Sequence, residues 1–177
     1  RSSDLDHSKL LCFGKTTDNM LVVINQYGRE VTEPFSDTHQ TSDGFLGLKK
    51  YDKYGGINDS GKLIIPIKFT SLYNWDSKGL ISIRDTGKNA LVDNTGKFIT
   101  TFKYDHIHTY KNGFARIIVN RKYGFINKYG KEIAKPLYDD LNNFSDNMAL
   151  FEKNGLKGFI DINGREIITA KYKQADR

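Results

Sequence analysis

One motif recurs through the whole chain: a glycine that closes a short polar turn. The intervals between successive turn glycines are 33, 35, 34 and 34 residues, at Gly28, Gly61, Gly96, Gly130 and Gly164. Each glycine ends an Asn/Asp-x-x-Gly turn, and a β-branched residue stands three positions later. Recurrence in constant phase requires a chain built from copies of one structural unit, here five copies with no linker between them.

A period near 34 residues is also that of helical hairpin repeats, so the local pattern decides the class. Short apolar runs flank every turn, such as LVVIN before Gly28 and KLII after Gly61. Two such runs joined by Asn/Asp-x-x-Gly predict a β-hairpin. A third run precedes each hairpin and alternates with period two, as at Leu46 and Leu48. We therefore predict an all-β protein of five three-stranded meanders, each joined to the next by a linking segment.

The repeats fill the sequence and predict a single β domain over residues 1–177. Their approximate bounds are 8–43, 44–78, 79–112, 113–147 and 148–177, which we call repeats 1 to 5. Apolar residues make up 38% of the chain, with 10 Tyr and 11 Phe, which excludes a disordered chain. The repeats either close into a propeller-like ring, which removes exposed sheet edges, or form an open twisted array.

Two columns of equivalent residues are expected to form the core. The first contains the β-branched residues after the turns: Val31, Ile64, Ile99, Ile133 and Ile167. In this arrangement Glu132, the neighbour of Ile133, points outward. The second lies in the linking segments and pairs an aliphatic with an aromatic residue three positions on: Leu72 with Trp75, Ile107 with Tyr110, and Leu141 with Phe144. Large aromatic residues dominate core burial, so Trp75 is expected to fill the core rather than to stack on a ligand.

The sequence leaves the compartment of the protein open. Its single cysteine, Cys12, rules out an internal disulfide framework and lies in an apolar strand, so we expect a buried thiol. There is no apolar run near 18 residues and no signal segment, so the chain is soluble as written. Because it begins with Arg1, it is either cytoplasmic or exported after loss of an N-terminal signal.

The repeat motif resembles the bacterial WG repeat, a β-repeat of the KWG type. The resemblance is strongest over YGFIN (Tyr123–Asn127), GKEI (Gly130–Ile133), PLYD (Pro136–Asp139) and Phe144-Ser145, and it returns at GFID and GREI in repeat 5. The tryptophan that names the repeat is replaced by Leu21, Tyr54, Asn89, Tyr123 and Lys157. The resemblance implies β-rich tandem arrays that act as binding or scaffold parts of bacterial proteins, and it carries no catalytic signature.

Metal and cofactor motifs are weak. His106 and His108 would point to the same side of a strand, with Asp105 nearby, but a strong zinc site supplies three or four ligands. The NDSG and DNTG turns lack the bidentate glutamate of a calcium loop, and their Asn, Asp and Gly suit a turn that needs positive φ. No nucleophile elbow, phosphate loop or dinucleotide fingerprint is present. We therefore expect no catalytic residue, metal or cofactor.

Function is predicted from the side of the linking segments opposite the buried column. We expect a strip that binds another protein, because its residues differ between repeats while the column between them does not. The strip comprises Tyr73, His106, His108, Asp140 and Asn142, with Lys78 and Lys111 close by, and Ser71 at the matching place in repeat 2. Tyr and His suit an interface because each combines apolar area with a polar group.

Two alternatives stay open. Residues 89–177 carry 15 basic and 10 acidic side chains, and the tyrosine-bearing stretch from Arg116 to Lys135 would suit single-stranded nucleic acid. The alternation of lysines also simply keeps strand surfaces soluble. The second alternative is an enzyme whose pocket no motif reveals. No membrane insertion is expected.

Overall fold

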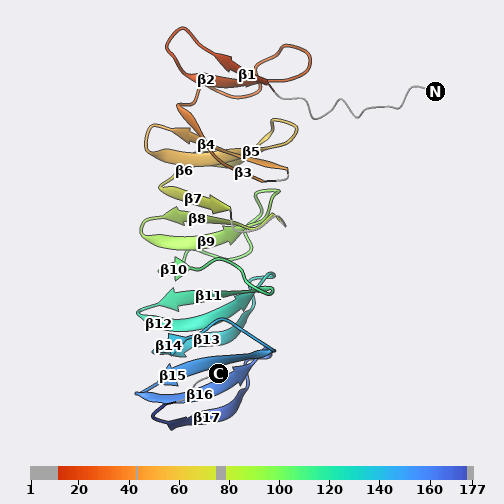
Figure 1. Cartoon of the computed structure of the whole chain (residues 1–177). Coiled ribbons are helices and arrows are strands. Elements are labelled where there is room, and N and C mark those ends of the chain that lie inside the picture. The colour runs from red at the N-terminus through yellow and green to blue at the C-terminus, as the bar shows by residue number, and fades with distance from the viewer. Residues whose placement is uncertain (1–11, 43, 75–78, 175–177) are drawn as a thin grey trace, which may run out of the picture. The chain divides into compact units, whose positions relative to one another are not determined.

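The computed structural model of the chain describes residues 12–42, 44–74 and 79–174 (Figure 1). Every regular element within these ranges is a β-strand, which confirms the all-β prediction. The described residues contain no helix long and apolar enough to cross a membrane. They divide into two compact units. The first unit comprises the described residues up to Thr86 together with Val92–Phe98, and the second comprises Gly87–Leu91 and the described residues from Ile99 onward.

The first unit contains two complete antiparallel sheets and a further strand pair. Repeat 1 supplies a two-stranded sheet of β1 (Cys12–Lys15) and β2 (Leu21–Ile24). A four-stranded sheet follows, with its strands in sequence order: β3 (Asp37–Ser42), β4 (Phe45–Lys50), β5 (Lys53–Asn58) and β6 (Leu63–Phe69). Strand β7 (Ser71–Asn74) pairs with β8 (Ile81–Asp85).

The second unit contains most of β9 (Lys88–Val92) and two four-stranded sheets that follow one another along the chain (Figure 1). The first sheet consists of β10 (His106–Ile107), from the linking segment of repeat 3, and of β11 (Phe114–Val119), β12 (Lys122–Asn127) and β13 (Glu132–Tyr138) of repeat 4. The second sheet consists of β14 (Asp140–Leu141), from the linking segment of repeat 4, and of β15 (Met148–Lys153), β16 (Leu156–Asp161) and β17 (Glu166–Tyr172) of repeat 5. Both sheets are antiparallel, with their strands in sequence order.

The linking segment is itself a strand, which corrects the three-stranded repeat expected from the sequence. In the second unit, β10 pairs with β11 through Ile107 and Ile117, and β14 pairs with β15 through Leu141 and Phe151. The buried column of the linking segments causes this. Leu72, Ile107 and Leu141 are all buried, as predicted, and burying them brings the segment beside the first long strand of the next repeat.

The turn motif has the same hydrogen bonds in all five repeats. In repeat 4 the Asn127 side-chain oxygen accepts from the backbone N–H groups of Tyr129 and Lys131, at 3.0 and 3.1 Å. The Gly130 N–H then donates to the Asn127 carbonyl at 3.0 Å, with Gly130 at φ +75°. Equivalent side-chain bonds form at Asn25, Asn58, Asp93 and Asp161. The Asn or Asp oxygen is therefore used within the turn, which explains why the motif needs that residue type.

A small residue six positions before the turn glycine allows a large bulge in the hairpin. Between β12 and β13, Tyr123 pairs with Tyr138 and Phe125 with Ala134, so four residues of β13 span two of β12. The extra residues arch over Gly124, where a Cβ would lie 2.5 Å from the Ala134 carbonyl oxygen. The shift in register thus requires glycine at this position.

Aromatic residues fill the core of the second unit where the two sheets meet. Phe144, in the linking-segment column, is buried and stacks on Phe125 with ring centroids 4.3 Å apart. Tyr110 is half-buried and its hydroxyl donates to the Asn127 carbonyl at 2.9 Å. These positions confirm the structural role predicted for the column. Trp75 lies outside the described residues.

Three facing predictions are wrong. Cys12 is exposed, because it lies at the start of a sheet of only two strands whose buried residues are in β2. Ile133 is only half-buried, and the residue after it, Ala134, is the buried one. Glu132 does not simply point outward: its carboxylate accepts from the Tyr104 hydroxyl at 3.1 Å and from Lys103 Nζ at 2.7 Å.

Candidate functional site

In the second unit, the predicted strip residues His106 and Asp140 occupy equivalent places on β10 and β14. His106 pairs across to Ile118 and Asp140 pairs across to Glu152. Both residues are exposed, whereas the residue that follows each of them is buried. The alternation predicted from the sequence is therefore present in two successive sheets.

His108 and Asn142 continue the same alternation just beyond the two short strands. The His108 N–H donates to the Arg116 carbonyl at 2.8 Å, and the Asn142 N–H donates to the Leu150 carbonyl at 2.9 Å. Asn142 is exposed and His108 is half-buried. The rings of His106 and His108 meet edge to face, with centroids 4.6 Å apart and an interplanar angle of 83°. Backbone hydrogen bonds thus fix all four polar residues relative to their sheets.

Arg116 is part of this site, although the sequence analysis placed it only in the basic stretch. Its Nη1 donates to the Leu141 carbonyl at 2.8 Å, so the side chain joins β11 to β14 of the next sheet. Its guanidinium lies 6.0 Å from the centre of the Tyr123 ring. A signal was available in the sequence: Ala115 and Ile117 face the core at period two, so Arg116 must lie on the opposite face beside the histidines.

The environment of His108 keeps its imidazole neutral at physiological pH. Burial, together with the positive charges of Arg116 and His106, lowers the pKa of His108 to about 4. The Nε2 atom of His108 is buried and has no hydrogen-bond partner among the described residues. The same is true of the Nε atom of Arg116. A charge on His108 is therefore disfavoured by both desolvation and repulsion.

The remaining strip residues are not all brought together. Lys111 is exposed in the turn before β11, where its N–H donates to the Phe114 carbonyl at 2.8 Å. Tyr73 belongs to the first unit, where it pairs with Ser82 of β8 and is 44% exposed. Ser71 is half-buried at the start of β7. Lys78 lies outside the described residues.

The third metal ligand considered for the histidine pair is engaged elsewhere. One Asp105 carboxylate oxygen pairs with Lys88, and the other accepts from the Asn120 N–H at 2.6 Å. This carboxylate therefore clamps the turn between β11 and β12. Within residues 12–42, 44–74 and 79–174, no group of three or more His, Cys, Asp or Glu residues is placed to hold a metal ion.

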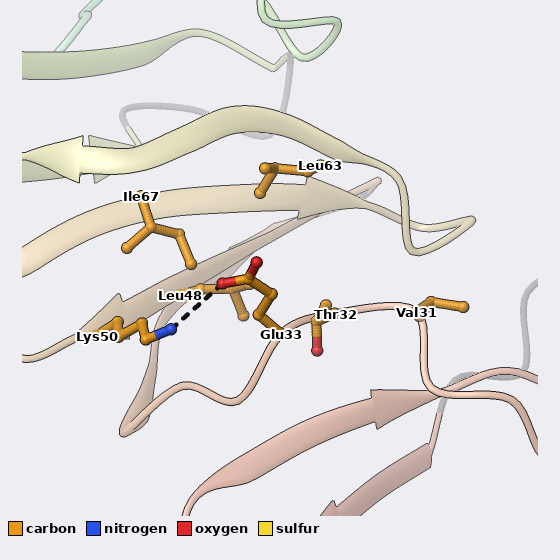
Figure 2. A pocket seen from close by; sticks show the side chains of 7 residues that line it. All are labelled: Val31, Thr32, Glu33, Leu48, Lys50, Leu63 and Ile67. Carbon is orange, nitrogen blue, oxygen red and sulfur yellow. Dashed lines mark hydrogen bonds and ion pairs between the residues drawn. The ribbon is translucent and has the colours of Figure 1, made fainter.

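The first unit contains a pocket of about 410 Å³ (Figure 2). Its lining is mainly aliphatic, from Val31, Leu48, Leu63 and Ile67, with Thr32 beside them. Figure 2 shows the Glu33 carboxylate pointing toward the Lys50 amino group, with which it forms an ion pair at 3.3 Å. The Glu33 side chain is largely exposed, so this pair is weakly stabilising. An apolar hollow with a paired charge at its side suits binding of an apolar group.

The rings proposed to stack on nucleic acid are not available for stacking. Phe125 is 1% exposed and belongs to the core cluster of the second unit. Tyr123 is half-buried under the Arg116 guanidinium. Tyr129 is the exposed ring of this stretch, with Lys128 Nζ 5.0 Å from its centre. Single-strand binding uses several exposed rings along a basic groove, so this geometry does not favour the nucleic-acid alternative.

The repeat geometry agrees with a match to a known family. The model of the family described as "WG containing repeat" matches residues 54–88, 91–123, 123–156 and 158–177, which is more than half of the chain. The chain belongs to this family. The four matched segments lie within repeats 2 to 5 described above. No curated protein matches the chain.

Solved structures similar to this WG-repeat chain share 10–12% sequence identity with it. One is Hsv2 of Kluyveromyces lactis, with 11% identity and a TM-score of 0.43 over 92% of this chain and 61% of that one. Another is described as a eukaryotic initiation factor, with 10% identity and a TM-score of 0.48 over 96% of this chain and 54% of that one. The chain thus spans only about three fifths of the length of the Hsv2 structures it matches.

Proposed function

We propose that this WG-repeat chain is a non-catalytic module that binds another protein through the strip of the linking segments. In the second unit the strip comprises His106, His108, Lys111, Asp140 and Asn142, and in the first unit Tyr73 occupies the equivalent place. Membership of a family of tandem β-repeats supports a binding role, since such arrays bind through positions that vary between repeats.

The observation that carries the proposal is the alternation of exposed and buried side chains along β10 and β14. Packing explains Ile107 and Leu141, which are buried in equivalent positions. The exposed neighbours differ in chemical type, with histidine on β10 and aspartate on β14. Constant buried residues between variable exposed ones are typical of a repeat surface that carries specificity.

Arg116 supports the proposal because it makes the strip rigid before any partner arrives. Its hydrogen bond to the Leu141 carbonyl connects strand β11 to β14, the linking strand that pairs with repeat 5. His108 lies beside it as an uncharged ring, because its pKa is lowered to about 4. A neutral imidazole is easier to desolvate at an interface than a charged one, and a preformed surface loses less entropy on binding.

The test is photo-crosslinking of the partner to the second unit, with the crosslinker placed either on the strip or on a surface away from it. A photo-crosslinking amino acid replaces His106 in one variant and Tyr129, in the turn after β12, in the other. We expect a specific protein adduct from position 106, and its loss in a His108→Ala/Asp140→Ala/Asn142→Ala background. The matched control is Lys128→Ala/Tyr129→Ala/Lys131→Ala, which removes exposed basic and aromatic residues of the same unit away from the strip.

Three outcomes would contradict the proposal. An adduct from position 129 that persists in the strip variant would place binding elsewhere. If the binding of the captured partner weakens steeply with rising salt concentration and disappears after nuclease treatment, the partner is a nucleic acid rather than a protein. Turnover of a small substrate by the purified chain would replace the binding role with a catalytic one. Unchanged melting temperatures of the two triple variants are the control for folding.

A further inference from the structure

The pocket of the first unit lies between repeats 1 and 2 and is lined mainly by aliphatic side chains (Figure 2). Val31 comes from repeat 1, and Leu48, Leu63 and Ile67 come from strands β4 and β6 of repeat 2. Leu63 is 51% exposed, so the pocket presents apolar surface to solvent. Its volume of about 410 Å³ lies in the range of small-molecule sites.

The wall that repeat 1 contributes is fixed by hydrogen bonds. The Val31 N–H donates to the Val23 carbonyl at 2.8 Å, and the Thr32 hydroxyl oxygen accepts from the Val23 N–H at 2.9 Å. Val23 and Leu48 are fully buried members of one core cluster, against which Val31 and Ile67 pack. The pocket is therefore a preformed part of the fold, which lowers the entropy cost of binding a ligand.

The charge at the pocket comes from Lys50, the last residue of β4. Its side chain is 31% exposed, and its amino group pairs with the Glu33 carboxylate at 3.3 Å. The Glu33 side chain is 87% exposed, so Lys50 receives its partner from the solvent side. Because an exposed ion pair of this kind is weak, a ligand carboxylate can replace Glu33 at little cost.

The contact between repeats 4 and 5 shows how a carboxylate fits at the equivalent place. Lys153 and Glu166 are the equivalents of Lys50 and Leu63, at the same distances in sequence from their turn glycines. The Glu166 carboxylate pairs with Lys153 Nζ at 3.4 Å and accepts from the Tyr138 hydroxyl at 3.2 Å. Repeat 2 keeps the lysine but has leucine in place of the glutamate, so the internal carboxylate is replaced by an apolar surface.

We propose that the pocket binds a small aliphatic carboxylic acid. Its carboxylate pairs with Lys50, as the Glu166 carboxylate pairs with the equivalent lysine of repeat 5, and displaces the Glu33 side chain into solvent. Its hydrocarbon chain lies against Leu63 and Ile67. Lys50 is the less exposed member of its ion pair, so the charge beside the apolar lining is positive and selects an acid rather than an amine. The lining residues are not those of the strip, so this site goes beyond the protein-binding function proposed above.

The test is isothermal titration calorimetry of the full chain at pH 7 with linear carboxylates from butanoate to decanoate. Affinity should rise about fourfold with each added methylene until the pocket is filled, because each methylene buries more apolar surface. Decanol has the same chain as decanoate but no carboxylate, and it should bind at least about tenfold more weakly.

Variants of three pocket residues locate the binding. Glu33→Gln removes the internal competitor for Lys50 and should strengthen decanoate binding about threefold. Lys50→Gln should weaken it at least about tenfold, and Leu63→Glu should prevent it by placing an internal carboxylate beside Lys50. Lys49→Gln is the matched control. It removes a lysine from the opposite face of β4, where Lys49 Nζ lies 5.6 Å from the centre of the Tyr54 ring, and it should leave the affinity unchanged.

The proposal is contradicted if decanoate fails to bind the wild type at millimolar concentration, or if Lys50→Gln and Lys49→Gln bind it equally well. Weaker binding by Glu33→Gln would also contradict it, because Glu33 would then be a ligand contact rather than a competitor. A peptide with a C-terminal leucine is the comparison ligand. If the peptide binds more tightly than decanoate and loses affinity in Lys50→Gln, the occupant is a peptide terminus and the assignment to a small acid is wrong. Unchanged melting temperatures of the four variants are the control for folding.

Discussion

The two units contain the same close backbone contact between consecutive repeats, which we call a joint, but with different side chains nearby. A Cβ built at Gly164 would lie 1.9 Å from the Ile133 carbonyl oxygen, and a Cβ built at Gly96 would lie 2.1 Å from the Ile64 carbonyl oxygen. In both, a turn glycine packs on the carbonyl of a β-branched residue in the preceding repeat.

At the positions where the second unit has Tyr104 with Glu132 and Tyr138 with Glu166, the first unit has Phe35 with Leu63 and Phe69 with Phe98. In the second unit each tyrosine hydroxyl donates to its glutamate. Lysines accompany the polar version, because Lys103 reaches Glu132 and Lys153 reaches Glu166. The comparison indicates that the backbone contact determines how repeats stack, and that the side chains are interchangeable as pairs.

The residue that follows each of these aromatic residues by one position also differs between the units, being neutral in the first and charged in the second. In the first unit, the Ser36 and Thr70 hydroxyls donate to backbone carbonyls of the next repeat at 2.9 and 3.0 Å. In the second unit, Asp139 takes the equivalent place, pairs with Lys122 and accepts from the Asn154 N–H at 2.6 Å. These contacts lower the pKa of Asp139. The second unit therefore depends on charge where the first depends on neutral groups.

The largest expected loss of stability comes from substituting the turn glycine of the backbone contact that both units share. Gly164→Ala in the second unit and Gly96→Ala in the first should each destabilise their own unit by about 3 kcal/mol, because a Cβ overlaps a carbonyl oxygen and φ is positive. Gly155→Ala, with the same φ but open surroundings, should lose only about 1 kcal/mol. Amide hydrogen exchange in β6 and β17 measures the two units separately. If all three variants were alike, the backbone joint would not be the common element.

A change at the polar joint should be smaller and confined to the second unit. Tyr104 is fully buried, so Glu132→Leu leaves its hydroxyl without this acceptor and should lower the free energy of unfolding by about 2 kcal/mol. Leu63→Gln is the mirror change in the first unit, where Leu63 is 51% exposed, and it should alter stability by less than about 0.5 kcal/mol. Urea denaturation of both variants checks this, and equal effects would remove the distinction between the joints.

Acid should weaken the second unit before the first. The pKa of His108 is lowered to about 4 in the fold, so the unfolded chain binds more protons between its ordinary pKa of 6.5 and pH 4. The stability that depends on neutral His108 is therefore complete above pH 6.5 and is lost as the pH falls toward 4. We expect a loss of about 1 kcal/mol, allowing for the exposed part of the ring.

Hydrogen exchange in β10 and β11 at pH 7 and pH 4.5 measures the effect of acid. His108→Gln should remove most of the difference between the two pH values. The equivalent residues of the first unit, Ser71 and Tyr73, are not histidines, so β7 and β8 serve as the internal control. Equal acid sensitivity in β7 and β10 would contradict the assignment to His108.

The repeat pattern predicted the strands, the turns and one buried column, because each depends on residues near in sequence. The Asn/Asp-x-x-Gly turn closes on itself, and the burial of Leu72, Ile107 and Leu141 follows from period-two alternation. The family assignment rested on the same local motifs. The strand character of the linking segments was missed because their pairing lies across the boundary between repeats.

Contacts between repeats were beyond the sequence pattern. Glu132 was expected to point outward, yet it binds Tyr104, a residue 28 positions earlier. The pairing of Tyr with Glu and of Phe with apolar residues is visible in the sequence once those positions are known to meet. For the candidate strip, the sequence identified the exposed residues of β10 and β14, but not that Arg116 connects them.

The most direct test of interchangeable joints is a double-mutant cycle at the joint of repeats 4 and 5. Tyr138→Phe and Glu166→Leu, alone and together, are compared by urea denaturation of the full chain at pH 7. We expect each single variant to be destabilised, and the double variant to recover about 1 kcal/mol relative to the sum, because it recreates the apolar pair of the first unit. Strictly additive effects would contradict the claim that these residues act as a pair.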